Sequence, residues 1–152
     1  MPGTVNSEMV QTLSVTREIE IAAPLDVSFE AILEQLGPGG SVPGEDHFPM
    51  KFEPWPGGRW FRDLGDNVGH WWGTVQVIKP PKLLEICGPL FMSYPAQSHV
   101  QYRLTEQGGG THLKLTHRAM GLISDEHREG VTTGWDHELE AIRRIAESQS
   151  RR

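Results

Sequence analysis

The stretch SDEHREGVTTGWDHELEAIRRIAE, residues 124–147, is the only apolar helical segment of the sequence long enough to cover a sheet. Its main apolar residues recur at steps of four, three and four positions and are Trp135, Leu139, Ile142 and Ala146. This period places them on one side of a helix. The charged residues Glu138, Glu140, Arg143 and Arg144 fall mainly off this stripe. The segment is therefore predicted to be an amphipathic C-terminal helix.

The start of this helix is marked by Ser124, whose side-chain oxygen can accept a hydrogen bond from a free backbone N–H. Asp125 and Glu126 complement the positive end of the helix dipole. Gly130 and Gly134 are unexpected in a helix interior, where each costs about 1 kcal/mol relative to alanine. Two glycines so close to a tryptophan predict a close approach to a sheet, or a bend.

The sequence before this helix consists mostly of short strand candidates. Residues 13–22 alternate as a first strand, and Pro24 then suits the first turn of a short helix that ends before Gly37. The later strand candidates are residues 50–53, 58–63, 70–78, 83–87, 98–104 and 111–118. Short Gly- and Pro-rich turns separate them, which favours antiparallel connections over parallel crossovers. Residues 37–46 form a Gly/Pro-rich loop, a candidate lid.

Alternation along the strands predicts which side chains face inward. Tyr102 shares the apolar side of its strand with two aliphatic residues, and so does His117 on the next strand. Val75 and Val77 are also expected on one face. The link from 88 to 97 is unusually apolar for a loop and is expected to fold back over an interior.

Together these patterns predict an α+β fold in which six to seven antiparallel strands bury their apolar face under the C-terminal helix, with short helical structure after the first strand. The length of 152 residues fits one domain, predicted as residues 13–152, preceded by a loose arm at residues 1–12. No second domain is expected.

Composition argues against several classes of function. A formal net charge of -6 and a pI of about 5.6 leave no large basic surface, so nucleic-acid binding is not expected. No window has the length of a membrane span and the N-terminus lacks a signal-peptide pattern, which predicts a soluble cytoplasmic protein. Cys87 is the single cysteine, which excludes an internal disulfide. The seven histidines show no metal-ligand spacing, so neither a metal nor another cofactor is predicted.

Four polar residues are candidates for chemistry. An inward His117 is either a hydrogen-bonded structural histidine or a residue with a ligand-contacting or acid/base role. Glu53 and Arg59 flank a Pro-Gly-Gly turn, where an ion pair that pins the hairpin is favoured over a catalytic pair. The Tyr102 hydroxyl is either a ligand donor or the polar end of a core tyrosine.

Several motifs, taken in their order and spacing, resemble one known family. They are Ala22 to Val27, Phe52-Glu53 followed by Pro56 to Trp60, Gly73 to Val75 leading to Pro80-Pro81, Leu113 to His117, and Gly134-Trp135. The sequence is similar to the START-like SRPBCC superfamily, in the branch named after the activator of the heat-shock-protein ATPase. The resemblance implies a helix-grip fold, with an elongated apolar cavity between the sheet and the long helix. Many relatives carry a tryptophan soon after the first helix, where this chain has the loop 37–44, so a differently built cavity mouth is expected.

The leading hypothesis is a pocket protein that binds a small hydrophobic molecule, lipid-, polyketide- or aromatic-like, without a cofactor or intrinsic catalysis. The predicted wall residues are Trp60, Trp72, Phe91, Met92, Tyr94, Tyr102, His117 and Trp135. The segment containing Trp60 and Phe61 has no clean alternation, so the sequence does not decide which of the two faces inward.

Two alternatives stay open. One is an enzyme similar to the superfamily's cyclases and dehydratases, using His117, Glu53 or Arg59 in the same cavity. The other is a chaperone-associated or homodimeric interaction module, which requires an exposed apolar patch of about several hundred Å².

Overall fold

The computed structural model describes residues 3 and 5–150. Within this range it contains seven strands and two helices: β1 (Gln11–Ile21), α1 (Leu25–Gln35), β2 (Lys51–Phe52), β3 (Arg59–Asp63), β4 (Gly69–Lys79), β5 (Leu83–Gly88), β6 (Ala96–Gln107), β7 (Gly110–Gly121) and α2 (Asp125–Ser150). Every predicted strand and both predicted helices are present, and the predicted α+β helix-grip class is confirmed. Residues 1, 2 and 4 of the predicted arm and the last two residues of the predicted domain lie outside the described residues.

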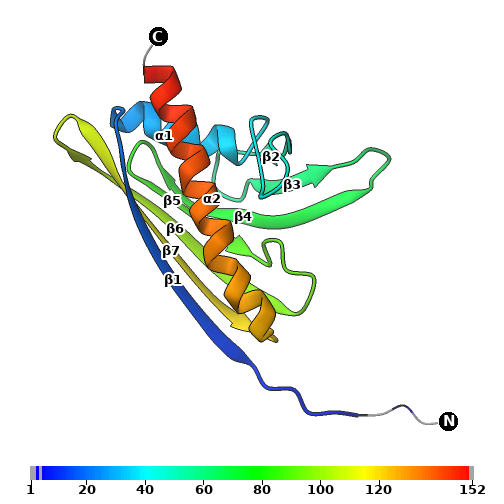
Figure 1. The fold of residues 1–152 in the computed structure, drawn as a ribbon. Helices are drawn as coiled ribbons and strands as arrows, with labels where there is room; N and C mark the ends of the chain where they lie inside the picture. The colour runs from blue at the N-terminus through cyan, green and yellow to red at the C-terminus, as the bar shows by residue number, and fades with distance from the viewer. Residues whose placement is uncertain (1–2, 4, 151–152) are drawn as a thin grey trace.

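The strands form one antiparallel sheet in the order β1-β7-β6-β5-β4-β3-β2. Apart from β1, this order follows the chain backwards through short turns, as the Gly- and Pro-rich connections predict. The sheet curves around α2, which crosses its concave face, while α1 packs beside the C-terminal half of α2 (Figure 1). None of the described helices is long and apolar enough to cross a membrane.

Helix α2 begins as the sequence predicts. The backbone N–H of His127 donates to the Ser124 side-chain oxygen at 3.1 Å, so Ser124 caps the helix. Leu139, Ile142 and Ala146 are fully buried against the sheet and α1. This apolar side fixes the orientation of the helix over the sheet.

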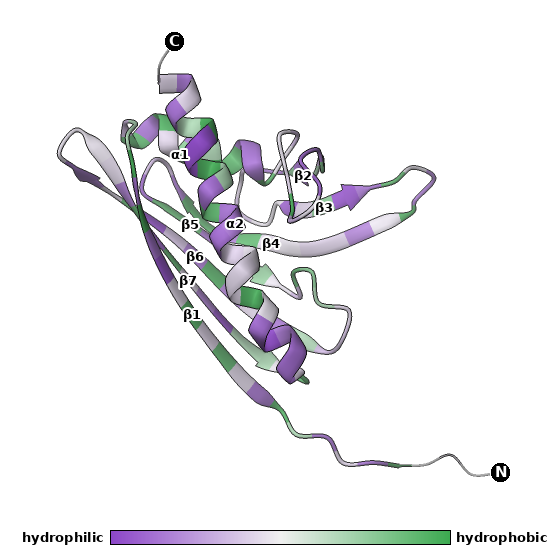
Figure 2. Cartoon of the chain, viewed as in Figure 1, coloured by the Kyte–Doolittle hydropathy of each residue, from purple (hydrophilic) through white to green (hydrophobic). Residues whose placement is uncertain are grey.

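Strand alternation sets which side chains reach the interior, and along the long strands hydrophobic and hydrophilic residues alternate (Figure 2). His117 pairs with Val15 on one neighbouring strand and with Val100 on the other, and all three side chains are buried. The alternation along the strand predicts this inward direction. The predicted shared face of Val75 and Val77 is wrong. A bulge at Gln76 pairs Val75 with the buried Ile86 but Val77 with Glu85, and an extra residue in a strand reverses the faces beyond it.

The buried apolar residues form two separate clusters. The larger one joins α1, the C-terminal half of α2 and most of the sheet. The smaller one joins the N-terminal part of α2 to one end of the sheet, through Leu13, Val15, Met92, Ala119, Ile123 and Val131. Trp135 contacts both clusters, which places it where they meet.

Candidate functional site

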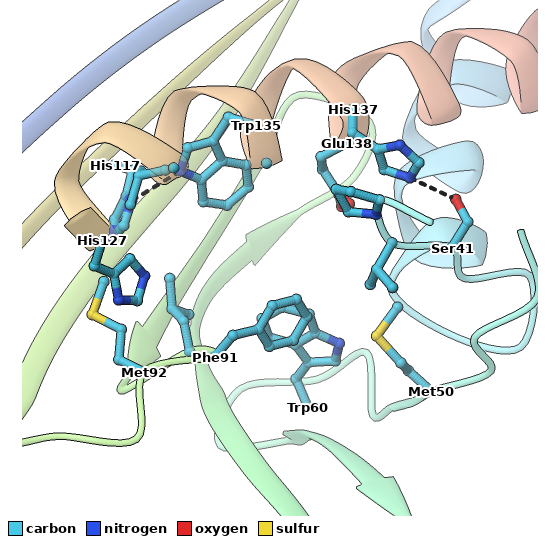
Figure 3. Close-up of a pocket in the computed structure, with 16 residues that line it drawn as sticks. Ser41, Met50, Trp60, Phe91, Met92, His117, His127, Trp135, His137 and Glu138 are labelled. Atoms are coloured by element: carbon cyan, nitrogen blue, oxygen red, sulfur yellow. Dashed lines mark hydrogen bonds between the residues drawn. The ribbon is translucent and has the colours of Figure 1, made fainter. Parts of the chain in front are cut away.

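A partly open cavity of ≈ 220 Å³ lies between α2 and the sheet, close to Trp135. Side chains of α2 border one side of it, and Met50, Trp60 and Phe91 face them from the other (Figure 3). Most of its walls are apolar, formed by Val42, Pro43, Met50, Trp60, Leu90, Phe91, Met92, Val131 and Trp135 together with Gly130 and Gly134. Five polar side chains also reach it: Ser41, His117, His127, His137 and Glu138. An apolar pocket with a few convergent polar groups is typical of a small-molecule site.

Five of the eight predicted wall residues line this cavity: Trp60, Phe91, Met92, His117 and Trp135. The apolar link between β5 and β6 supplies Phe91 and Met92, because it folds back toward α2 as its composition predicts. The uncertainty between Trp60 and Phe61 is resolved. Trp60 is buried in the cavity wall, whereas Phe61 lies at the surface beneath the Arg59 guanidinium, 4.4 Å from the ring centroid.

The other three predicted residues stand one layer behind the wall. Trp72 packs against the rings of Trp60 and Phe91, at centroid distances of 5.2 and 4.5 Å. Tyr94 meets His127, with its hydroxyl 2.8 Å from Nδ1. The fully buried Tyr102 packs beside Trp135 at 6.4 Å. These residues support the wall rather than form it. For Tyr102, which lies on a strand, alternation predicts the direction of the side chain but not its depth.

The aromatic side of the cavity is tightly built. Trp60, Trp72 and Phe91 meet in edge-on and tilted arrangements, which are favourable for aromatic rings. The buried indole N–H of Trp60 has no hydrogen-bond partner among the described residues. An unpaired buried donor costs about 1–3 kcal/mol, so the packing of this wall offsets a local penalty.

At one end of the cavity, His117 is held on both sides. The Trp135 indole N–H donates to its Nδ1 at 2.9 Å, and its Nε2 lies 3.0 Å from the Ser98 hydroxyl. Because an indole nitrogen only donates, Nδ1 must be the unprotonated nitrogen and Nε2 must carry the proton. Burial lowers the pKa of His117 to about 4, and nearby His127 adds to this effect. His117 is therefore neutral, with both ring nitrogens occupied by protein groups.

At the other end lies Glu138, which the sequence pattern placed off the apolar stripe. That prediction is wrong. Its carboxylate lies at the cavity, where the Gln35 side-chain amide donates to Oε2 at 3.0 Å and the Tyr102 hydroxyl to Oε1 at 3.5 Å. Burial raises the pKa of Glu138 to about 7, although both hydrogen bonds oppose that rise. The pKa of Tyr102 is well above its usual value, mainly because the side chain is buried and also because the Glu138 carboxylate lies beside it.

A signal for Glu138 was present in the sequence. It lies three residues after Trp135, four after Gly134 and four before Ile142, so it belongs to the inner face of the helix. An ionisable residue inside an apolar stripe marks a candidate site. His127 and His137 gave no comparable signal, because their partners are distant in sequence.

Gly130 and Gly134 also have a different role from the predicted close approach to the sheet. A Cβ built at either position meets no atom within 4 Å, and both residues line the cavity. Gly130 is exposed and Gly134 is half-buried, so the missing side chains leave open space beside one turn of α2 where it borders the cavity. Glycine here widens the cavity instead of permitting tight packing.

The loop after α1 closes one edge of the cavity through Ser41, Val42 and Pro43. Ser41 is anchored on both sides, with its carbonyl accepting from Gln35 at 2.8 Å and its hydroxyl 3.1 Å from His137 Nε2. This loop is the Gly/Pro-rich segment expected to build the mouth differently. It links the mouth to α1 and α2 at once.

Glu53 and Arg59 do not line the cavity. The Arg59 guanidinium makes two hydrogen bonds of 3.0 and 3.2 Å to the Glu53 carboxylate, which also accepts from the Arg59 backbone N–H. The pair closes the turn at 56–58, as the sequence favours, and it lowers the pKa of Glu53. In residues 3 and 5–150, no group of three metal-ligating side chains is placed to hold an ion.

Comparisons with solved structures agree on the fold. An uncharacterised protein from Rhizobium leguminosarum superimposes with a TM-score of 0.72 at 16% identity, covering 94% of this chain and 99% of that one. CalU16 from Micromonospora echinospora gives 0.60 at 21% identity, covering 93% and 88%. The di-domain ARO/CYC protein BexL, from the BE-7585A biosynthetic pathway, gives 0.63 at 18% identity, covering 91% of this chain and 50% of BexL.

Sequence comparison gives the family. Among curated proteins, none matches the chain. The family described as Activator of Hsp90 ATPase homolog 1-like protein matches residues 46–147, which run from the loop before β2 almost to the end of α2 and include most of the cavity wall. The chain therefore belongs to the family of Activator of Hsp90 ATPase homolog 1-like proteins, within the START-like SRPBCC superfamily.

Proposed function

We propose that this protein binds a small, largely apolar molecule in the cavity between the sheet and α2. The observation that carries the proposal is the cavity of ≈ 220 Å³, with its apolar and aromatic walls, at the junction of two separately packed clusters. The open space beside Gly130 and Gly134 supports it, because two glycines where the helix borders the cavity cost helix stability. The fold shared with BexL, an ARO/CYC protein of a biosynthetic pathway, is consistent with a polyketide-like or aromatic ligand.

Binding without catalysis is favoured by the state of His117. A general base needs a ring nitrogen free to take a proton, and both nitrogens of His117 are engaged by Trp135 and Ser98. Glu53 and Arg59 are paired with each other outside the cavity.

A second candidate function is an enzyme of the cyclase or dehydratase kind. Glu138 favours it, because it lines the cavity and its pKa is raised to about 7 by burial. A carboxyl group with such a pKa can give or take a proton near neutral pH. This candidate uses Glu138 in place of the predicted His117, Glu53 or Arg59.

The binding proposal is tested by filling the cavity from the helix. Gly134→Leu places a side chain in the open space, and Thr133→Leu adds a leucine at the neighbouring exposed position as the matched control. Isothermal titration with 2-naphthalenemethanol, a neutral aromatic probe, is expected to show binding to wild type and Thr133→Leu and at least a roughly tenfold loss in Gly134→Leu. Native mass spectra are expected to show any co-purified adduct on wild type and Thr133→Leu, and less of it on Gly134→Leu. Equal binding by all three proteins would contradict the proposal.

A further inference from the structure

We infer that the preferred ligand carries a protonated amine, which Glu138 binds at one end of the cavity while the aromatic walls hold an apolar body. This inference rests on the proposed function and narrows it to one chemical class, lipophilic amines. It follows from the charges and hydrogen-bonding capacity of the cavity wall.

Among the residues that the structure describes, the cavity wall contains one carboxyl group, Glu138, three histidines, His117, His127 and His137, and no lysine or arginine. His117, which also borders it, is fixed in its neutral form by the Trp135 indole. A carboxylate or phosphate ligand would therefore bring a second negative charge near Glu138 without a guanidinium or ammonium to receive it. Like charges in a poorly solvated site repel strongly, so the wall discriminates against fatty acids and other anions.

Glu138 has capacity left for a ligand. Gln35 donates to one carboxylate oxygen and Tyr102 to the other, whereas an ionised carboxylate has about four lone-pair positions. Among the described residues, Glu138 forms no ion pair. An ammonium group would supply the missing counter-charge through charge-assisted hydrogen bonds, which are about twice as strong as neutral ones. The raised pKa of Glu138 agrees with a carboxyl group that lacks such a partner.

The apolar part of the cavity suits the rest of such a molecule. Trp60 and Phe91 face Trp135 across the space, and Glu138 extends from α2 one turn beyond Trp135 (Figure 3). Aromatic faces attract cations as well as apolar groups. A neutral alcohol of the same shape would use the walls and one hydrogen bond, but it would not neutralise the carboxylate.

The test compares three probes of nearly equal shape by isothermal titration at about pH 8, where Glu138 is mostly ionised. They are 2-naphthylmethylamine (cationic), 2-naphthalenemethanol (neutral) and 2-naphthoic acid (anionic). In wild type the amine is expected to bind at least about tenfold more tightly than the alcohol, and the acid most weakly. In Glu138→Gln the advantage of the amine is expected to fall to within about threefold of the alcohol. Glu140→Gln is the matched control, because Glu140 pairs with Arg143 and does not line the cavity.

The outcomes separate the two claims. Equal affinity of amine and alcohol in wild type would overturn the amine assignment and leave the proposed function standing, and this comparison needs no variant. An amine advantage that persists in Glu138→Gln would overturn the role of Glu138. Binding of none of the three probes to wild type would overturn the inference together with the proposed function.

Discussion

His117 at one end of the cavity and Glu138 at the other are held in opposite ways. His117 meets protein partners at both ring nitrogens, and burial lowers its pKa to about 4. Glu138 also has two protein partners but keeps lone pairs for others, and burial raises its pKa to about 7. Burial thus favours the neutral form at both ends. The difference lies in unused hydrogen-bonding capacity, because both ring nitrogens of His117 are engaged whereas Glu138 keeps lone pairs that the proposed amine would use.

The largest expected effect is a loss of folding stability when His117 is removed. His117→Ala removes a buried side chain and leaves Trp135 Nε1 and Ser98 Oγ without their partner, so the free energy of unfolding should fall by about 2–4 kcal/mol. His112→Ala is the matched control on the same strand. His112 pairs with Glu18 and Glu20 near the surface, and its loss should cost less than about 1 kcal/mol. Urea unfolding of both variants measures the two losses of stability. Equal losses would show that His117 matters no more for folding than the surface residue His112.

A second prediction uses the opposite pKa shifts. The folded-state pKa of Glu138 is raised, so its effect on stability becomes more unfavourable as pH rises from about 4.5 to about 7. The folded-state pKa of His117 is lowered, so its effect becomes more favourable as pH rises from about 4 to about 6.5. Each contribution amounts to at most about 3 kcal/mol, and in wild type they largely cancel between pH 4.5 and 6.5.

Glu138→Gln should expose the histidine contribution alone. Its free energy of unfolding should rise by about 2–3 kcal/mol between pH 4.5 and 6.5, whereas that of wild type changes little. Urea unfolding across this range measures the difference. Parallel pH profiles for the two proteins would show that Glu138 is not held in a raised-pKa state. His112 does not interfere, because its raised pKa affects stability only as pH rises above about 6.5.

A smaller effect is expected where the helix borders the cavity. Gly134→Ala should raise the free energy of unfolding by about 0.5–1 kcal/mol, because alanine favours a helix and its Cβ meets no atom. The same change should weaken binding of 2-naphthalenemethanol, because it takes up cavity space. Thermal unfolding and titration of one sample measure both. A loss of stability would mean that the glycine is needed for packing.

The smallest effect concerns the support of Glu138. Tyr102→Phe removes a hydrogen bond of 3.5 Å, which is near the limit for such contacts, so stability should change by about 0.5 kcal/mol or less. Because this hydrogen bond lowers the pKa of Glu138, its loss should raise that pKa further. A ¹³C NMR titration of the Glu138 carboxyl carbon measures the change. A lowered pKa would show that the hydroxyl does not donate to the carboxylate.

The fold was predictable because its signals are local and repeated. Alternation placed Tyr102 and His117 inward, and Ser124 marked the start of α2. The error at Val77 came from one inserted residue, a bulge that no local pattern in this strand announces.

The candidate site was less predictable, because it depends on depth and on contacts between distant residues. Tyr102 points inward as expected but lies behind Trp135. Alternation along a strand predicts which face a side chain is on, but not how deep it lies. Glu138 was missed because helix faces were assigned from apolar residues alone. Its partner Gln35 lies on the other helix, 103 positions earlier in the sequence.

The separation of the interior into two apolar clusters has a consequence for motion. The N-terminal half of α2 packs on the smaller cluster, through Val131, and the C-terminal half packs on the larger one. Segments with separate, smaller cores open locally at lower free energy than the whole domain. Amide hydrogens in the N-terminal half of α2 are therefore expected to exchange with solvent faster than those near Ile142. A ligand in the cavity would touch both clusters at once, so its binding should slow exchange most in that first half and make the helix open as one unit.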